Sequence, residues 1–303
     1  MQFISFIIIY PLIWLISRLP MRVLYLLSDF IFFFMFRVFK YRKTVVENNI
    51  RMAFPKKEEK EIKNIAKKFF SHLTDLIVES IKSFSISEKE SLKRYTYKNP
   101  ELVNKLIAEG KSIILTGAHQ SNWEWSFNLP IVLNTSIYGA YTRISNKYFD
   151  EKIYSSRTKF GAIGLKGSKM IQGMADNHKN NIQGLYILLS DQSPQLQKTY
   201  YWKEFMGIKV PIHTGAEMLA KRHNLTVVNY VTRRKKRGYY EGEFTLITDE
   251  PKNFKDYEIT DKYLTLTEQN IKDHPEFYLW SHKRFKHKDK YDQWLAKKQK
   301  SNS

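Results

Sequence analysis

Residues 112–124 read SIILTGAHQSNWE, and this stretch decides the fold of the chain. Its first part, residues 112–116, is a short apolar run that is typical of a strand buried on both faces of a sheet. Further strand candidates lie at residues 136–142, 185–190, 226–232 and 243–248, and helical candidates lie at 101–109, 150–160, 168–177 and 213–223. Strands that alternate with helices predict an α/β fold in which helices flank the sheet.

A histidine and a carboxylate follow the end of this strand. Ligands of open α/β sheets bind beyond the strand ends, and Glu124 comes five residues after His119, where the first turn of a helix favours a negative charge. A carboxylate that orients an imidazole lets the ring take a proton from a hydroxyl group. A His-x4-Glu spacing also arises by chance, so a capped helix start beside a structural histidine is an open alternative.

Other catalytic devices are missing from the sequence. The chain has no cysteine, which excludes thiol nucleophiles and Cys-zinc sites. It also has no Gly-x-Ser-x-Gly elbow, phosphate-binding glycine loop or His-Glu-x-x-His motif. Direct attack by a substrate hydroxyl is therefore favoured over an acyl-enzyme, and we expect neither a metal nor a cofactor.

The charge is strongly positive. Lys and Arg number 50 against 30 Asp and Glu, a formal net charge of +20. Such an excess suits an anionic membrane surface, an acidic protein or nucleic acid, and a merely solvated basic surface is the alternative. The apolar N-terminus and the lack of an aromatic–basic module argue against nucleic acid.

The first 39 residues are apolar and split at Pro20 into runs at residues 3–17 and 23–36. They lack the basic start and the small-residue cleavage site of a signal peptide. Each run is shorter than the ~20 residues that a membrane span needs. Three arrangements stay open: a monotopic hairpin turned at Pro20, one tilted span, or a helix pair packed on the body of the protein.

Basic residues follow this segment directly, namely Arg37, Lys40, Arg42 and Lys43. Basic residues beside an apolar segment prefer the cytoplasmic side and attract anionic lipids. The mean hydropathy of −0.47 argues against several spans. We therefore expect a membrane anchor at residues 1–40 and a catalytic domain with a basic tail at residues 41–303, facing the cytoplasm.

Five blocks of the chain, in order, resemble the bacterial lipid A biosynthesis acyltransferases, also called lauroyl/myristoyl acyltransferases. The family's His-x4-Asp/Glu block is similar to residues 117–124. The other four blocks are YRKTVVENNI with FP (41–55), RTKFG (157–161), LLSDQ with FMG (188–207) and PEFYLWSHKRFK (275–286). The resemblance implies the fold class of the glycerolipid acyltransferases, and a place at the cytoplasmic (inner) membrane.

The resemblance also implies a reaction. A fatty acyl chain would pass from a thioester, on acyl carrier protein or CoA, to a hydroxyl of a lipid A precursor or related membrane glycolipid. A relative acting on another lysolipid or an aminolipid, and a non-catalytic basic membrane-bound protein, are the alternatives.

The matched blocks give four catalytic candidates. His119 is expected to act as the base with Glu124 behind it. Arg157 is expected to stabilise charge on the thioester oxygen or hold a phosphate, and Asp191 to orient Arg157 or cap the next turn. The candidates for substrate contacts are Asn122, Arg143, Gln192 and Arg284.

Overall fold

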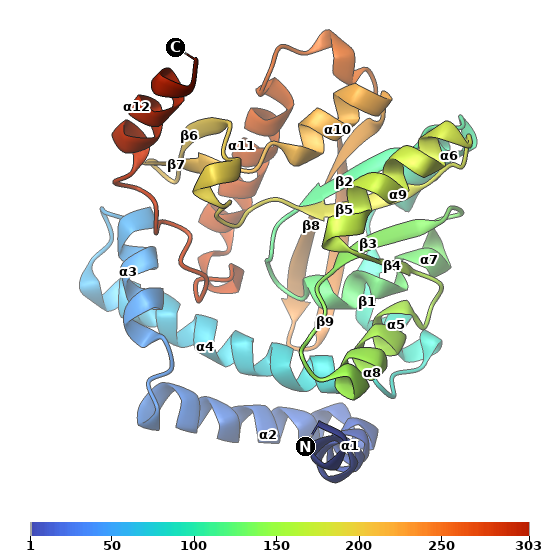
Figure 1. Ribbon diagram of the computed structural model, residues 1–303. Helices are drawn as coiled ribbons and strands as arrows, with labels where there is room; N and C mark the ends of the chain where they lie inside the picture. Colours follow the sequence, from blue (N-terminus) through green and yellow to red (C-terminus); the bar gives the residue numbers. More distant parts are fainter. Residues whose placement is uncertain (1, 303) are drawn as a thin grey trace.

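The computed structural model describes residues 2–302, and within that range seven strands form one mixed sheet in the order β1-β9-β8-β2-β5-β3-β4 (Figure 1). The predicted α/β sheet flanked by helices is confirmed. Neighbouring strands are parallel except β8 and β9, which form an antiparallel hairpin. The strand bounds are β1 (Tyr95–Tyr97), β2 (Ile113–Gly117), β3 (Ile137–Tyr141), β4 (Ile163–Lys166), β5 (Leu185–Leu189), β8 (Thr226–Lys236) and β9 (Tyr239–Thr248).

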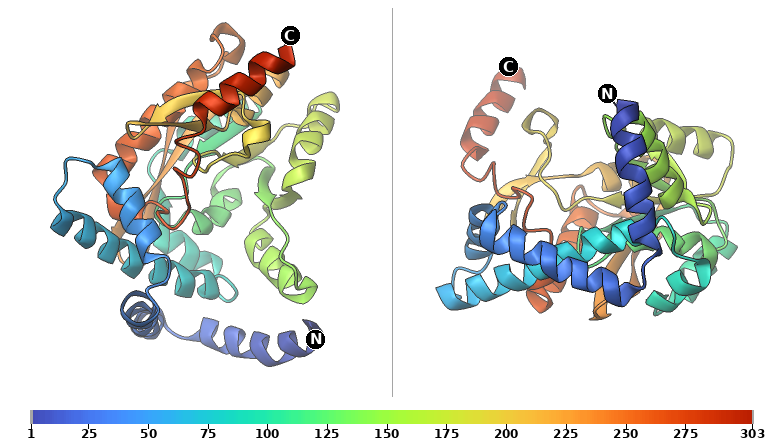
Figure 2. Two further views of the ribbon diagram at one scale, coloured as in Figure 1. Left: turned by 60° about the vertical axis from the view of Figure 1, so that its left-hand side comes forward. Right: turned by 90° about the horizontal axis from the view of Figure 1, so that it is seen from below.

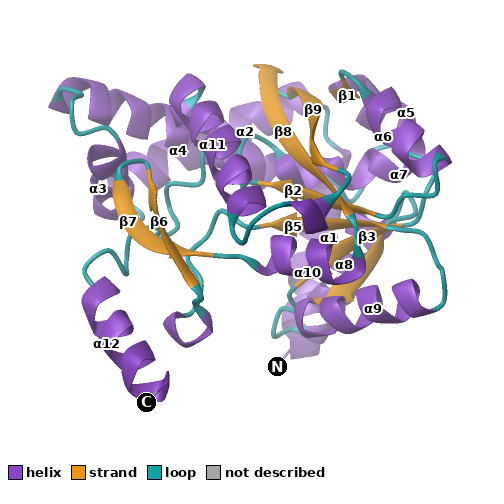
Figure 3. Cartoon of the chain, turned by 90° about the horizontal axis from the view of Figure 1, so that it is seen from above, coloured by secondary structure: helices purple, strands orange, loops and turns teal. Residues whose placement is uncertain are grey.

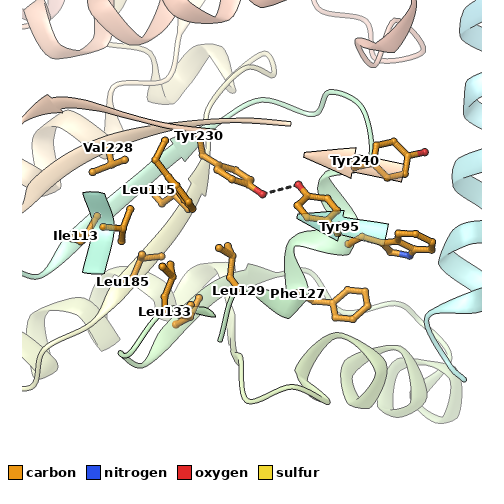
Figure 4. Close-up of a cluster of buried hydrophobic side chains, with 14 of the residues drawn as sticks. Tyr95, Ile113, Leu115, Phe127, Leu129, Leu133, Leu185, Val228, Tyr230 and Tyr240 are labelled. Atoms are coloured by element: carbon orange, nitrogen blue, oxygen red, sulfur yellow. Dashed lines mark hydrogen bonds between the residues drawn. The ribbon is translucent and has the colours of Figure 1, made fainter. Parts of the chain in front are cut away.

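The apolar run at residues 112–116 forms the central strand β2. It lies between β8 and β5, and every residue of it is buried. Ile113 and Leu115 face one core cluster, shown in Figure 4, and Ile114 faces another on the opposite side of the sheet. A parallel strand covered on both faces needs an unbroken apolar sequence, which explains why the run carries no polar alternation.

Helices cover both faces of the sheet. On one face lie α6 (Pro100–Ala108), the 3₁₀ helix η2 (Trp123–Asn128), α7 (Leu129–Val132) and the end of α4 (Glu59–Lys82). On the other face lie α9 (Gly167–Lys179), α10 (Gly215–His223) and part of α11 (Glu258–Asp273). The remaining helices include α3 (Lys43–Ala53), α5 (Glu88–Arg94), α8 (Lys147–Thr158) and α12 (Tyr291–Asn302).

A second hairpin, β6 (Tyr201–Phe205) with β7 (Ile208–Ile212), stands apart from the main sheet near α3 and α12 (Figure 3). It belongs to a further core cluster that also contains residues of α3, α4 and α11. The segment after α11, including Tyr278 and Trp280, packs into the same cluster. This cluster therefore joins the C-terminal part of the chain to the helices α3 and α4.

The two apolar runs at the N-terminus form α1 (Gln2–Arg18) and α2 (Met21–Phe33), and a π-helical turn, Phe34–Val38, continues α2. Both helices lie in one layer beneath the body and run at a steep angle to each other (Figures 1 and 2). None of the helices in the described range combines the length and the apolar character needed to cross a membrane. Met1 of the expected anchor and Ser303 of the expected tail lie outside the described residues.

Candidate active site

Two neighbouring parallel strands bring His119 and Asp191 together. Gly117, the last residue of β2, pairs with Leu189, the last residue of β5. His119 and Asp191 each follow two residues later, so both lie beyond the same edge of the sheet. The His119 Nδ1 lies 2.7 Å from the Asp191 Oδ1. The equal offset from two apolar strands is the sequence signal that could have predicted this pair.

The environment of Asp191 determines which ring nitrogen of His119 carries the proton. The side chain is 1% exposed. Burial would raise the pKa of Asp191, but the hydrogen bond and attraction from His119, with backbone hydrogen bonds, hold that pKa below its usual value. An ionised Asp191 keeps the proton on Nδ1 of His119. Nε2 is then a proton acceptor, and it has no hydrogen-bond partner among the described side chains.

Glu124 and Arg157 form the second pair. The guanidinium of Arg157 donates to both carboxylate oxygens of Glu124, over 3.0 Å and 2.8 Å. The partners therefore differ from those expected from the sequence, in which Glu124 lay behind His119 and Asp191 either oriented Arg157 or capped the next turn. The reason is local, because residues 123–128 form the 3₁₀ helix η2, which turns Glu124 toward α8 rather than back to the imidazole.

Both pairs meet at a cavity of about 320 Å³ between the sheet and α8. His119, Glu124 and Arg157 line it. Most of the remaining wall is apolar, and it includes Phe127, Pro130, Ile137, Ile187 and Leu189. Mostly apolar walls with a few convergent polar groups are typical of a small-molecule site.

The segment after α11 braces the loop that carries His119. The Leu279 N–H donates to the His119 carbonyl over 3.1 Å, and the Ser121 N–H donates to the Phe277 carbonyl over 2.9 Å. Ser121 has a φ of 52°, so the loop turns sharply there. The C-terminal block matched in the sequence thus holds the active-site loop in position.

Asn122, a candidate for substrate contact, is instead buried in the protein. Its side chain accepts from the Trp125 N–H over 3.0 Å and donates to Glu79 over 2.7 Å. These bonds begin η2 and tie it to α4. Asn122 therefore positions the turn that carries Glu124, and it lies outside the described lining of the cavity.

The other three candidates lie away from the cavity wall. Arg143 is exposed and 3.7 Å from Asp150, and it lines a second hollow that shares Tyr141, Tyr154 and Gly164 with the main cavity. Gln192 lies half-buried in the loop after β5. Arg284 is 1% exposed, stacks over the Phe205 ring and donates to the Pro211 carbonyl. None of the three belongs to the described lining.

Comparisons with known proteins identify the family of the chain. The family model described as "Bacterial lipid A biosynthesis acyltransferase" matches residues 2–287. The lipid A biosynthesis lauroyltransferase of Escherichia coli (strain K12) is 24% identical over 280 residues, which cover 90% of this chain and 89% of that protein. The chain belongs to the bacterial lipid A biosynthesis acyltransferase family, and it is an acyltransferase.

Proposed function

We propose that this acyltransferase moves a fatty acyl chain from a thioester donor to a hydroxyl of a lipid A precursor or related membrane glycolipid. One observation carries the proposal. A histidine held by a buried carboxylate opens into a cavity that has a largely apolar residue lining and also contains an arginine. The cavity can bind a hydrocarbon chain, and the histidine can take a proton from a hydroxyl. The arginine can stabilise an oxygen that becomes negatively charged.

The reaction follows from these positions. Nε2 of His119 takes the proton from the acceptor hydroxyl, and the oxygen attacks the thioester carbonyl. Arg157 stabilises the negative charge on the carbonyl oxygen, and Glu124 orients Arg157 through the two hydrogen bonds. When the carbon–sulfur bond breaks, His119 returns the proton to the leaving thiolate. An ester and a free thiol result.

The donor is an acyl carrier protein or CoA. Both carriers are anionic, and the net charge of +20 would attract either of them. The family and the name of the Escherichia coli relative, a lipid A biosynthesis lauroyltransferase, support a lipid A precursor as the acceptor.

The proposal is tested with purified protein, labelled acyl donor and extracted membrane lipids. We expect a labelled lipid from the wild type and a loss of ~10²–10⁴-fold in His119→Ala, since the general base is removed. Circular dichroism checks that the variant is folded. Activity of His119→Ala close to that of the wild type would refute the mechanism.

We also propose that residues 1–40 attach the protein to the cytoplasmic membrane, with residues 41–303 as the catalytic domain on the cytoplasmic side. The layer formed by α1 and α2 carries exposed apolar side chains, and Ile8 and Leu26 are 66% and 70% exposed. Arg18, Arg22 and Arg37 flank these faces. Apolar helix faces bordered by basic residues favour binding within the plane of an anionic surface.

The position of α1 supports this attachment. Phe6 of α1 packs edge-on against Phe149 of α8, with ring centres 5.3 Å apart. The helix α8 carries Arg157 on its last turn. A lipid surface beneath α1 would therefore lie beside α8, the helix that forms one wall of the cavity.

A further inference from the structure

Two glycines lie side by side in the sheet under the cavity. Gly139 of β3 pairs with Gly164 of β4, and on its other side it pairs with Ile187 of β5. Both glycines line the cavity. Two neighbouring positions at this level of the sheet, one on β3 and one on β4, therefore have no side chain.

The two positions differ in what surrounds them. A Cβ built on Gly164 would come within 2.5 Å of the Tyr154 ring, so Tyr154 fills that space. A Cβ built on Gly139 meets nothing within 4 Å, and its φ is outside the left-handed range. Neither sterics nor backbone conformation requires a glycine at 139. Because glycine weakens a strand interior, the fold gains nothing from it there.

The level of Gly139 in the sheet places it below His119 along the strand direction. Gly139 and Leu115 both pair with Ile187, so the three residues lie at one level of the sheet. That level is two residues, roughly 7 Å, below the end of β2, beyond which His119 lies. A chain that enters past His119 and runs down the sheet face would reach the bare position.

We propose that the open space above Gly139 sets the length of acyl chain that the enzyme accepts. The inference rests on the proposed function, because it takes the cavity as the acyl-chain site. The neighbouring walls are Phe127, Pro130, Ile137 and Leu189. These four side chains have no hydrogen-bonding groups, so this part of the wall favours hydrocarbon over the hydroxyls of a sugar, whose burial without hydrogen bonds is costly; Tyr141 and Tyr154 supply hydroxyls elsewhere in the lining.

The test fills the space stepwise with Gly139→Ala, Gly139→Val and Gly139→Leu. The value of kcat/KM is measured for saturated acyl thioesters from eight to sixteen carbons, on CoA and on acyl carrier protein, with extracted membrane lipids as acceptor. Gly215→Ala and Gly215→Val are the matched controls, since a Cβ at Gly215 also meets nothing within 4 Å and Gly215 lies outside the described lining. Thermal unfolding by circular dichroism checks each fold.

We expect the preferred chain to shorten in the order Ala, Val, Leu. The longest chain that the wild type uses well should lose about 10-fold or more in kcat/KM, whereas the shortest should change by less than about 3-fold. The Gly215 variants should keep the wild-type profile. An unchanged profile, or an equal loss at all lengths in the Gly139 variants, would overturn this inference and leave the proposed function standing. A wild type that transfers no acyl chain from either carrier would refute the proposed function itself, and this inference with it.

Discussion

The hydrogen bond between His119 and Asp191 determines which ring nitrogen is available as a base. Asp191→Asn keeps the size of the side chain but can present an amide N–H to Nδ1, which favours the tautomer with its proton on Nε2. We predict a fall in kcat of ~10²–10⁴-fold with an unchanged circular dichroism spectrum. Asp176→Asn, on the exposed part of α9, is the control. A kcat within about 3-fold of the wild type would show that Asp191 does not set the tautomer.

Substitutions in the Glu124–Arg157 pair can distinguish a catalytic role of the pair from a structural one. Both side chains are partly exposed, at 28% and 44%, so their coupling in the free energy of unfolding should be at most about 1 kcal/mol. In kcat/KM we predict that Glu124→Ala and Arg157→Ala each cost ~10²–10³-fold and that the double variant costs little more. Losses that multiply in the double variant would mean that Glu124 does not act through Arg157.

At this scale the sequence identifies the residues better than their partners. His119, Glu124 and Arg157 do line one cavity, and Asp191 touches His119. The pairing depends on strand order and on a 3₁₀ turn after residue 122, neither of which leaves a periodic pattern. Asn122 and Arg284 are buried and lie outside the described cavity lining, and the burial of a polar side chain cannot be read from its residue type.

At the scale of elements, the layer formed by α1 and α2 has one side that packs on the body and one side that faces outward. Leu24 of α2 is fully buried and Tyr25 donates to Glu79, whereas Ile8 and Leu26 face outward. Deleting residues 1–40 would therefore also open the core. Substitution of exposed side chains is the cleaner test of membrane attachment.

We predict that the wild type stays with membranes in high salt and is released by detergent, because salt screens charges but not apolar burial. The double variant Ile8→Ser/Leu26→Ser should weaken the apolar contribution to membrane binding, so that high salt then releases the protein. Ile171→Ser, an exposed isoleucine on α9, should behave as the wild type. Release of the wild type by salt alone, in a sedimentation assay, would contradict attachment through apolar side chains.

Sequence patterns predict the long elements and miss the short ones. The five expected strands correspond to β2, β3, β5, β8 and β9, and the break at Pro20 separates α1 from α2. The strands β1 and β4 have three and four residues, too few for an alternation to be visible. The β6–β7 hairpin was not predicted either, although its turn at Met206 and Gly207, both with positive φ, is typical of a two-residue hairpin loop.

At the scale of the whole molecule, a buried carboxylate links the N-terminal layer to the active-site loop. Glu79 of α4 accepts from Tyr25 of α2, from Tyr240 of β9 and from Asn122 beside the active site. Burial raises the pKa of Glu79 to about 7, although the hydrogen bonds from the two tyrosines oppose the rise. One side chain thus connects three layers, and its charge changes near neutral pH.

The raised pKa of Glu79 predicts a dependence of stability on pH. Between about pH 4.5 and 7 the folded protein keeps a proton on Glu79 that the unfolded chain has released, so this contribution is full below that window and is lost as the pH rises through it. Urea unfolding of the wild type and of Glu79→Gln, at pH 4.5 and at pH 8, isolates the contribution of Glu79 protonation to the free energy of unfolding. We expect the free energy of unfolding of the wild type, relative to the variant, to fall by about 3 kcal/mol. A constant difference would mean that Glu79 has an ordinary pKa.

The central claim is that His119 drives acyl transfer to a membrane lipid hydroxyl. Mass spectrometry of total lipids tests it most directly, in cells that lack the gene and carry either the wild type or His119→Ala at equal protein level. We predict that one glycolipid lacks one acyl chain without the gene, that the wild type restores the chain and that His119→Ala does not. Restoration by His119→Ala, or a lipid profile that does not change when the gene is lost, would contradict the account.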